Sequence, residues 1–179
     1  MCADPYAVAD GADPQGAPLP TWNPVLFEPR NGPLMLFYKI GPDPRHWLGL
    51  QRTSTDGGRT WSAAKRLPDG LVGPVRSPPM QLRDGSLLSP SSTEDAGWRI
   101  HFERLEKSAS RDWKRMPPIP NPARIEAIQP VLLPGPDGNL LALGRTQQDH
   151  VFATTSHDDG RHWQALRLLD LPNPNAAID

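Results

Sequence analysis

The stretch SHDDGRHW at residues 156–163 decides the fold, because a second copy of its pattern, STDGGRTW, stands at residues 54–61. Both copies read Ser-x-Asp-x-Gly-x-x-Trp. In a short turn the Asp can accept backbone N–H bonds, the Gly can adopt a positive φ, and the Trp can pack under the hairpin. Two such turns, each flanked by short apolar runs, indicate an internal repeat.

The repeat has a period of about fifty residues. Three turn glycines, Gly32, Gly85 and Gly138, are separated by 53 residues each. The tryptophans that close the units are separated by 52 and 50 residues; they are Trp61, Trp113 and Trp163. Each period holds four short strand-like runs, as a four-stranded propeller blade requires. The sequence therefore predicts an all-β fold, a β-propeller of four-stranded antiparallel blades with about three blades present as a partial ring.

The expected blade boundaries are approximate. An irregular lead-in at residues 1–21, rich in Ala, Asp, Gly and Pro, precedes the repeats, and residues 171–179 resemble the lead-in to a fourth blade. In the second unit, residues 108–113 would form a closing turn without its glycine. Because propellers typically close with four to eight blades, we expect either a fragment of a longer product or a ring completed by self-association. The three blades are expected at about residues 22–68, 75–116 and 125–170.

Composition limits the possible partners and locations. The 179 residues carry a net charge of −1, with 37% hydrophobic and 22% charged residues, so we expect one soluble domain and neither nucleic acid nor an anionic membrane as partner. The 23 prolines, against about 9 at average usage, favour strands and turns. The single Cys2 gives no intramolecular disulfide and no cysteine-based metal site. Without a visible signal peptide or membrane span, the chain as written is predicted to be cytoplasmic.

The repeated turn resembles the Asp-box, or BNR repeat, of sialidases and other propeller proteins. In those proteins the box lies on the outer edge of a blade, far from the propeller axis. The resemblance therefore implies a scaffold role, and not catalysis, for the box residues of both copies. They are Ser54, Asp56, Gly58, Trp61, Ser156, Asp158, Gly160 and Trp163.

Three further runs, WNPVLF at 22–27, SSTEDAGWRIHFE at 91–103 and LPNPN at 171–175, resemble one branch of the sialidase-like BNR family. The resemblance covers about residues 20–179. It implies a six-bladed propeller of roughly twice this length, to whose middle half the chain is similar. It also implies an exo-α-sialidase-like glycoside hydrolase that removes terminal sialic acid or a related sugar acid from glycans, without cofactor or metal.

The resemblance suggests two site residues in the third unit. Sialidases bind the substrate carboxylate with three arginines, use a Tyr nucleophile primed by a Glu, and protonate the leaving group with an Asp. By this similarity Glu126 looks like the Tyr-activating base, and Arg145, nineteen residues later, like one carboxylate-binding arginine. A guanidinium fork matches a carboxylate, and a nearby base eases deprotonation of a Tyr. The structural alternative is a plain ion pair between the two.

Other polar residues could line a sugar pocket at the axis. Arg76 precedes an inner strand, and Glu94 and His101 lie before and on a third strand. His101 and Glu103 share a strand face, because side chains two residues apart point the same way. The alternative for these residues is an acidic loop and an alternating solvent face. Trp98 could stack on a sugar or belong to the core.

The rest of a sialidase site is not visible. By resemblance, the first arginine and the acid Asp would precede Trp22, while the Tyr and the third arginine would follow Asp179. The tyrosines present, Tyr6 and Tyr38, lie in the lead-in and in a core-like strand. We therefore expect negligible activity from this chain alone. The alternatives are a non-catalytic carbohydrate-binding or scaffold propeller, and another glycosidase or lyase acting on a uronic or nonulosonic acid.

Overall fold

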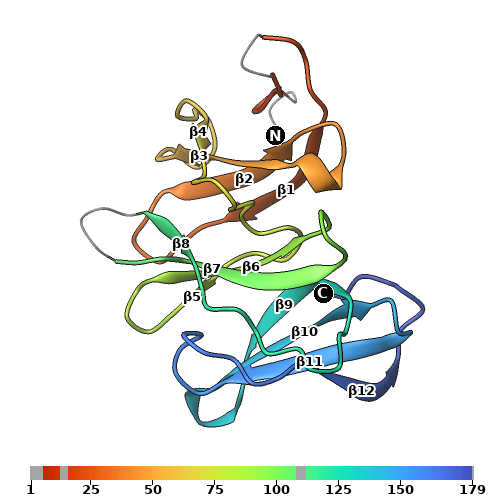
Figure 1. The fold of residues 1–179 in the computed structure, drawn as a ribbon. Coiled ribbons are helices and arrows are strands. Elements are labelled where there is room, and N and C mark those ends of the chain that lie inside the picture. The colour runs from red at the N-terminus through yellow and green to blue at the C-terminus, as the bar shows by residue number, and fades with distance from the viewer. Residues whose placement is uncertain (1–5, 13–15, 108–111, 179) are drawn as a thin grey trace.

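The computed structural model describes residues 6–12, 16–107 and 112–178, whose strands form three four-stranded antiparallel sheets (Figure 1). The expected second closing turn, at 108–113, lies mostly outside these ranges. In each sheet the strands are ordered as in the chain, and the prediction of three four-stranded blades is confirmed. Helix within the described ranges is limited to two 3₁₀ turns, η1 (Pro44–His46) and η2 (Pro136–Gly138), and none there could span a membrane.

The strand bounds follow the repeat. The first sheet holds β1 (Thr21–Phe27), β2 (Leu34–Ile40), β3 (Leu48–Ser54) and β4 (Lys65–Arg66). The second holds β5 (Met80–Gln81), β6 (Leu87–Thr93), β7 (Arg99–Leu105) and β8 (Trp113–Arg115). The third holds β9 (Ala127–Pro134), β10 (Leu140–Thr146), β11 (His150–Ser156) and β12 (Arg167–Pro172). Because β12 ends at Pro172, the first two residues of the expected fourth lead-in belong to the third sheet.

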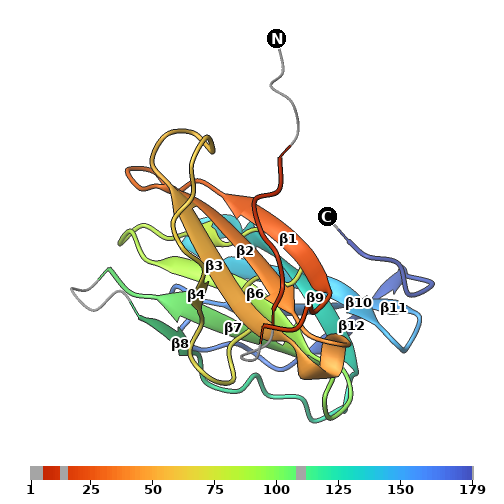
Figure 2. The same cartoon turned by 90° about the horizontal axis from the view of Figure 1, so that it is seen from above.

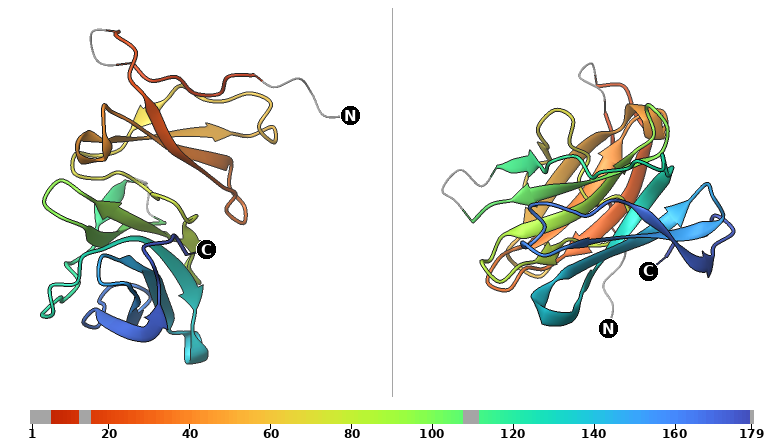
Figure 3. Two further views of the ribbon diagram at one scale, coloured as in Figure 1. Left: turned by 90° about the vertical axis from the view of Figure 1, so that its right-hand side faces the viewer. Right: turned by 60° about the horizontal axis from the view of Figure 1, so that its bottom comes forward.

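The three sheets stack face to face, with the first covering the second when seen from above (Figures 2 and 3). Alternate side chains of each strand point into the spaces between sheets, where they exclude water. Two of the three closing tryptophans join neighbouring sheets, whereas Trp61 packs against Leu36, Tyr38 and Ile40 of its own sheet. Trp113 packs edge-on against Phe37 of β2 at 5.7 Å between ring centroids, and Trp163 stacks on Phe102 of β7 at 4.1 Å. Trp113 and Trp163 therefore each fix their own sheet to the preceding one.

Both Ser-x-Asp-x-Gly-x-x-Trp turns are closed by their Ser and Asp side chains. Ser54 Oγ accepts the Gly58 N–H at 2.8 Å, and Ser156 Oγ accepts the Gly160 N–H at 2.9 Å. Asp56 accepts hydrogen bonds from the hydroxyl and the backbone N–H of Thr60. These bonds, the hydroxyl first, hold the pKa of Asp56 well below its usual value. The Ser and Asp side chains therefore stabilise the turns through these hydrogen bonds.

The turn glycines offer a matched test of this packing. Gly58 and Gly160 have φ values of +87° and +75°, so an alanine is strained at either position. A Cβ at Gly160 would also lie 2.5 Å from Leu88 Cδ2 of the second sheet, whereas a Cβ at Gly58 would lie 3.5 Å from its nearest neighbouring atom. We expect Gly160→Ala to lower the free energy of unfolding by about 1 to 3 kcal/mol more than Gly58→Ala does, because of overpacking. Urea unfolding measures the difference, and equal losses would contradict the packing account.

The lead-in packs on the outer face of the first sheet. Val8, Ala9 and Leu19 cover the buried side chains of Leu36, Tyr38 and Ile40. The Tyr6 hydroxyl donates to the carbonyl oxygens of Gly58 and Arg59 in the first turn. Large apolar side chains remain exposed on the two outermost sheets; they are Leu26, Leu133, Leu168 and Leu171.

Candidate functional site

Glu126 and Arg145 lie at one end of the third sheet. Glu126 directly precedes β9, and Arg145 is the next-to-last residue of β10. Arg145 is opposite Ile128, and the Gln147 N–H donates to the Glu126 carbonyl oxygen at 3.0 Å. Opposed residues of antiparallel strands share a face, and alternate residues return to it. The register thus places Glu126 and Arg145 on the same face.

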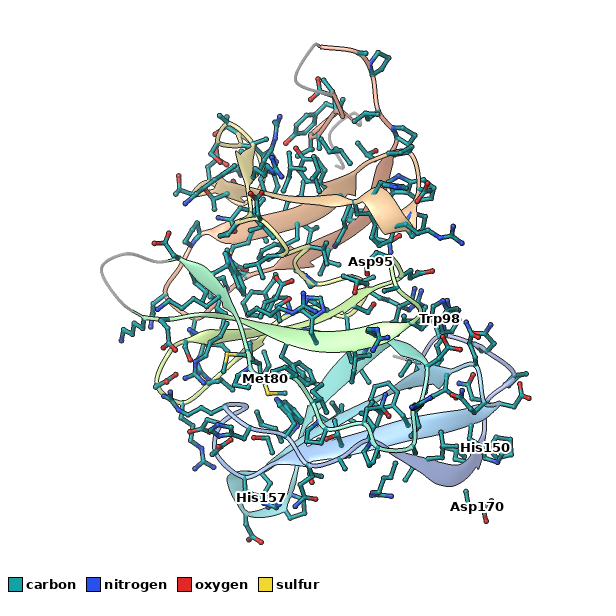
Figure 4. All side chains as sticks on the ribbon, in the orientation of Figure 1. Met80, Asp95, Trp98, His150, His157 and Asp170 are labelled. Atoms are coloured by element: carbon teal, nitrogen blue, oxygen red, sulfur yellow. The ribbon has the colours of Figure 1, made fainter. Side chains whose placement is uncertain are left out.

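The loop between β6 and β7 closes over these two residues. The guanidinium carbon of Arg145 lies 5.0 Å from the centroid of the Trp98 ring, which is within range for a cation–π interaction. A Cβ on Gly97 would come within 2.9 Å of Glu126 Oε1, so the carboxylate rests against this glycine. Figure 4 shows Trp98 at the end of the second sheet, beside the third. We call Glu126, Arg145 and Trp98 the Arg145 cluster.

Within the described residues, no ion pair joins Glu126 to Arg145. Glu126 is half-buried, and its N–H donates to the Gln148 side-chain oxygen at 3.2 Å. Arg145 donates through Nη1 to the Asn175 carbonyl oxygen at 3.1 Å, and its Nε is buried without a partner. The plain ion pair held open as the structural alternative is therefore not what the structure shows.

Arg145 also has a structural task that repeats in every sheet. Lys39, Ser92 and Arg145 each stand seven residues after the turn glycine of their unit. Each of these side chains forms a hydrogen bond with a main-chain group outside its own sheet. That group lies either in the segment that leads to the next unit or in the next unit itself. The main-chain partners are Pro74 O, Gln129 N and Asn175 O. Arg145 differs from the other two because its guanidinium lies over the Trp98 ring. Its Nη2 group also makes no hydrogen bond in the described part of the chain.

The other predicted site residues are separate from this cluster. Arg76 is exposed on the segment ahead of β5, where it lines a cavity together with Asn23 and Gln129. Glu94 is half-buried in the loop between β6 and β7, four residues before Trp98. The structure thus keeps Glu94 on the same loop as Trp98, while Arg76 lines a cavity whose lining includes no residue of the Arg145 cluster.

His101, which remains a prediction as a sugar-pocket residue, is nearly buried between the first two sheets. The residue is only 4% exposed, and its Nε2 lies 2.9 Å from Glu103 Oε1. The two residues do share a face, as predicted, but that face is covered by the segment linking the first two sheets. Glu103 accepts the N–H groups of Val72 and Gly73 of this segment at 2.9 and 3.0 Å. His101 therefore belongs to the interface between sheets.

Sequence reasoning missed Lys39, which is fully buried in β2. Its Nζ donates to the Pro74 carbonyl oxygen. Burial lowers the pKa of Lys39 to about 7, although the charge of Glu103 acts in the opposite direction. The available signal was a lysine inside the otherwise apolar run LMLFYKI at Leu34–Ile40.

A family model described as a BNR repeat-like domain matches residues 3–179. The chain belongs to this family. In this BNR protein both Ser-x-Asp-x-Gly-x-x-Trp turns follow the third strand of a sheet. Figure 4 shows His157, in the second turn, at the end of the molecule opposite Trp98. The search of curated proteins found no match.

Solved structures show which proteins share the fold. A Hadza microbial sialidase has a TM-score of 0.70 and 18% identity over 90% of this chain and 37% of its own. A Dyadobacter fermentans protein of unknown function has a TM-score of 0.69 and 17% identity over 89% of this chain. The NanB sialidase of Streptococcus pneumoniae has a TM-score of 0.60 and 18% identity over 92% of this chain and 27% of its own. The chain spans 53% of the Dyadobacter protein, and it has the fold of sialidase-like BNR propellers.

Proposed function

We propose that this BNR chain is part of an exo-α-sialidase-like glycoside hydrolase acting on terminal sialic acid or a related sugar acid of glycans. Arg145 would bind the sugar carboxylate, and Glu126 would activate a tyrosine nucleophile supplied from outside the Arg145 cluster. The observation that carries the proposal is the Arg145 guanidinium held over Trp98 beside Glu126. The sialidases that share the fold support the substrate class.

The chemistry of the cluster fits recognition of an anion. A guanidinium binds a carboxylate through parallel N–H···O bonds, and Arg145 Nη2 makes no hydrogen bond within the described residues. Stacking on Trp98 restricts the orientation of the guanidinium plane, which lowers the entropy lost on binding. A neutral Tyr nucleophile suits an anionic sugar, because a carboxylate nucleophile would repel it. A Glu beside that Tyr can take its proton.

A second candidate function is carbohydrate recognition without cleavage. It is favoured by the positions of Tyr6 and Tyr38. Tyr38 is 2% exposed within β2, and the Tyr6 hydroxyl is bonded to the first Ser-x-Asp-x-Gly-x-x-Trp turn. Neither tyrosine is therefore placed to serve the Arg145 cluster, whereas Arg145 could still bind a carboxylate.

A binding titration with a sialic-acid transition-state analogue tests both candidate functions. We expect Arg145→Ala to weaken binding about tenfold to a hundredfold, as expected for losing a hydrogen bond to a charged group. Arg167→Ala, at an exposed site on β12, should leave the affinity unchanged. Equal affinity of the wild type and Arg145→Ala would overturn the proposed role. Cleavage of a fluorogenic sialoside by the pure chain, abolished in Glu126→Gln, would instead show that the chain needs no outside tyrosine.

A further inference from the structure

A cavity of about 520 Å³ opens between the first two sheets, at the end where the turn glycines lie. Its lining comes from the hairpin turns that follow β1 and β5 and from the strand ends beside them. β6 begins at this end and finishes at Thr93, ahead of the loop that holds Trp98. The cavity, which we call the turn cavity, is therefore at the other end of the second sheet from the Arg145 cluster, and none of that cluster lines it.

The repeat explains why one wall of the turn cavity is open. Met35 and Leu88 are equivalent, because each stands three residues after the turn glycine of its unit. The second Ser-x-Asp-x-Gly-x-x-Trp turn covers Leu88 so closely that a Cβ on Gly160 would lie 2.5 Å from it. In the second unit Leu105 stands where both of these turns have their Ser, since all three residues pair with the first residue of the second strand. The surface that such a turn covers at Leu88 is at Met35 part of a cavity wall.

The rim of the turn cavity carries an excess of positive charge. Its two acidic residues already face Arg104, whose Nη2 lies 2.6 Å from Asp84 Oδ2 and whose Nε lies 3.2 Å from Glu106 Oε1. Four exposed basic residues of the lining form no ion pair with any described residue; they are Arg30, Lys65, Arg83 and Lys107. A cleft lined by charge of one sign concentrates the opposite ions. The turn cavity is therefore suited to an anion.

The floor of the turn cavity is apolar. Met35 and Leu87 are 6% and 4% exposed, and Leu105 is half-buried beside them. An apolar group placed on this floor leaves water, which favours binding. The thioether of Met35 also makes favourable contacts with aromatic rings. A volume of 520 Å³ falls within the range of small-molecule sites, about 300 to 1,000 Å³. The floor and the volume thus fit a ring system that carries a charged group.

We propose that the turn cavity binds a small aromatic molecule that carries a sulfonate, sulfate or phosphate group. The ring would lie on the apolar floor and the anionic group among the basic side chains of the rim. These side chains come from both sheets: Arg30 and Lys65 belong to the first, and Arg83 and Lys107 to the second. An anion with three terminal oxygens can accept hydrogen bonds from both sides at once. The inference does not rest on the proposed hydrolase function.

An NMR titration of the full chain, with isotope-labelled methionine methyl groups, tests the proposal. The ligand is naphthalenesulfonate, and its counterparts are naphthylmethanol, which lacks the charge, and methanesulfonate, which lacks the ring. We expect naphthalenesulfonate to shift the Met35 resonance until the site is saturated. Met80 and Met116 pack between the second and third sheets, so their resonances should stay in place. Naphthalenesulfonate should bind at least tenfold more tightly than either counterpart.

A pair of double variants tests the rim. Arg30→Gln with Lys107→Gln should weaken naphthalenesulfonate binding by about tenfold or more, as expected for losing hydrogen bonds to a charged group. Lys114→Gln with Arg161→Gln removes the same charge at exposed positions outside the lining and should leave the affinity unchanged. The proposal is overturned if Met35 does not shift, if all three methionines shift together, if either counterpart binds equally well, or if the rim variant binds like the wild type.

Discussion

Replacing Glu103 with glutamine is expected to lower the free energy of unfolding by about 3 to 5 kcal/mol, the loss typical of breaking a buried charged contact. The Glu103 side chain is fully buried, and each of its oxygens accepts a backbone N–H, one from Val72 and one from Gly73. Its Oε1 also lies 2.9 Å from His101 Nε2. Glutamine keeps the size but presents an NH₂ group where an acceptor is needed, and Lys39 loses the favourable charge beside it.

Urea unfolding at neutral pH measures this loss. Glu28→Gln is the matched control, because Glu28 is exposed, and substitutions at such sites usually change stability by less than about 0.5 kcal/mol. Should Glu103→Gln unfold within 1 kcal/mol of the wild type, Glu103 does not hold the first two sheets together.

The arrangement of strands into sheets could be predicted because the sequence patterns that indicate it each lie within one short turn. The glycine and tryptophan spacings each belong to one turn, and they set the number and order of the strands. The polar interface between the first two sheets could not be predicted in the same way. Its members come from β2, from the segment after β4, and from β7, which are about thirty residues apart in sequence. Only the stacking of sheets brings Lys39, Glu103 and the segment at residues 72–74 together.

The alternation in β7 shows where the sequence pattern misleads. The run RIHFERL predicts one apolar and one polar face, with the polar face lining a sugar pocket or exposed to solvent. In a stack of sheets the middle sheet is covered on both faces, so His101, Glu103 and Arg104 are all buried. Their polar groups must then be satisfied within the protein. Arg104 donates through Nη1 to the Asp159 carbonyl oxygen and through Nη2 to Asp84, whereas its Nε and His101 Nδ1 are buried without a hydrogen bond in the described residues.

The candidate site was only partly accessible to sequence reasoning. The family resemblance predicts Glu126 just before one strand and Arg145 at the end of the next, and the structure has both at these places. The sequence leaves Trp98 as either a sugar-stacking residue or a core residue, because its position under the Arg145 guanidinium depends on the neighbouring sheet. Asn23, Arg76 and Gln129 each stand nine residues before a turn glycine, but that they line one cavity is visible only in the folded protein.

Lys39 should make the stability of the protein rise with pH between about 7 and 10. The unfolded chain binds the lysine proton up to its ordinary pKa of about 10.4, whereas burial lowers the pKa of Lys39 in the folded state to about 7. Between these values the unfolded state holds one proton more, so stability increases by up to about 1.4 kcal/mol per pH unit. The favourable contribution is complete above pH 10.4 and is lost as the pH falls to 7.

Lys39→Met isolates this effect, because the other titrating groups are common to both proteins. We expect the free energy of unfolding of the wild type, relative to Lys39→Met, to rise by about 4 kcal/mol from pH 7 to pH 10. Lys65→Met, at an exposed position of β4, should follow the wild type throughout. Urea unfolding at pH 7, 8, 9 and 10 gives the curves. Parallel curves for the wild type and Lys39→Met would mean that Lys39 keeps its proton in the folded protein, and that its bond to Pro74 is that of an ammonium group at every pH tested.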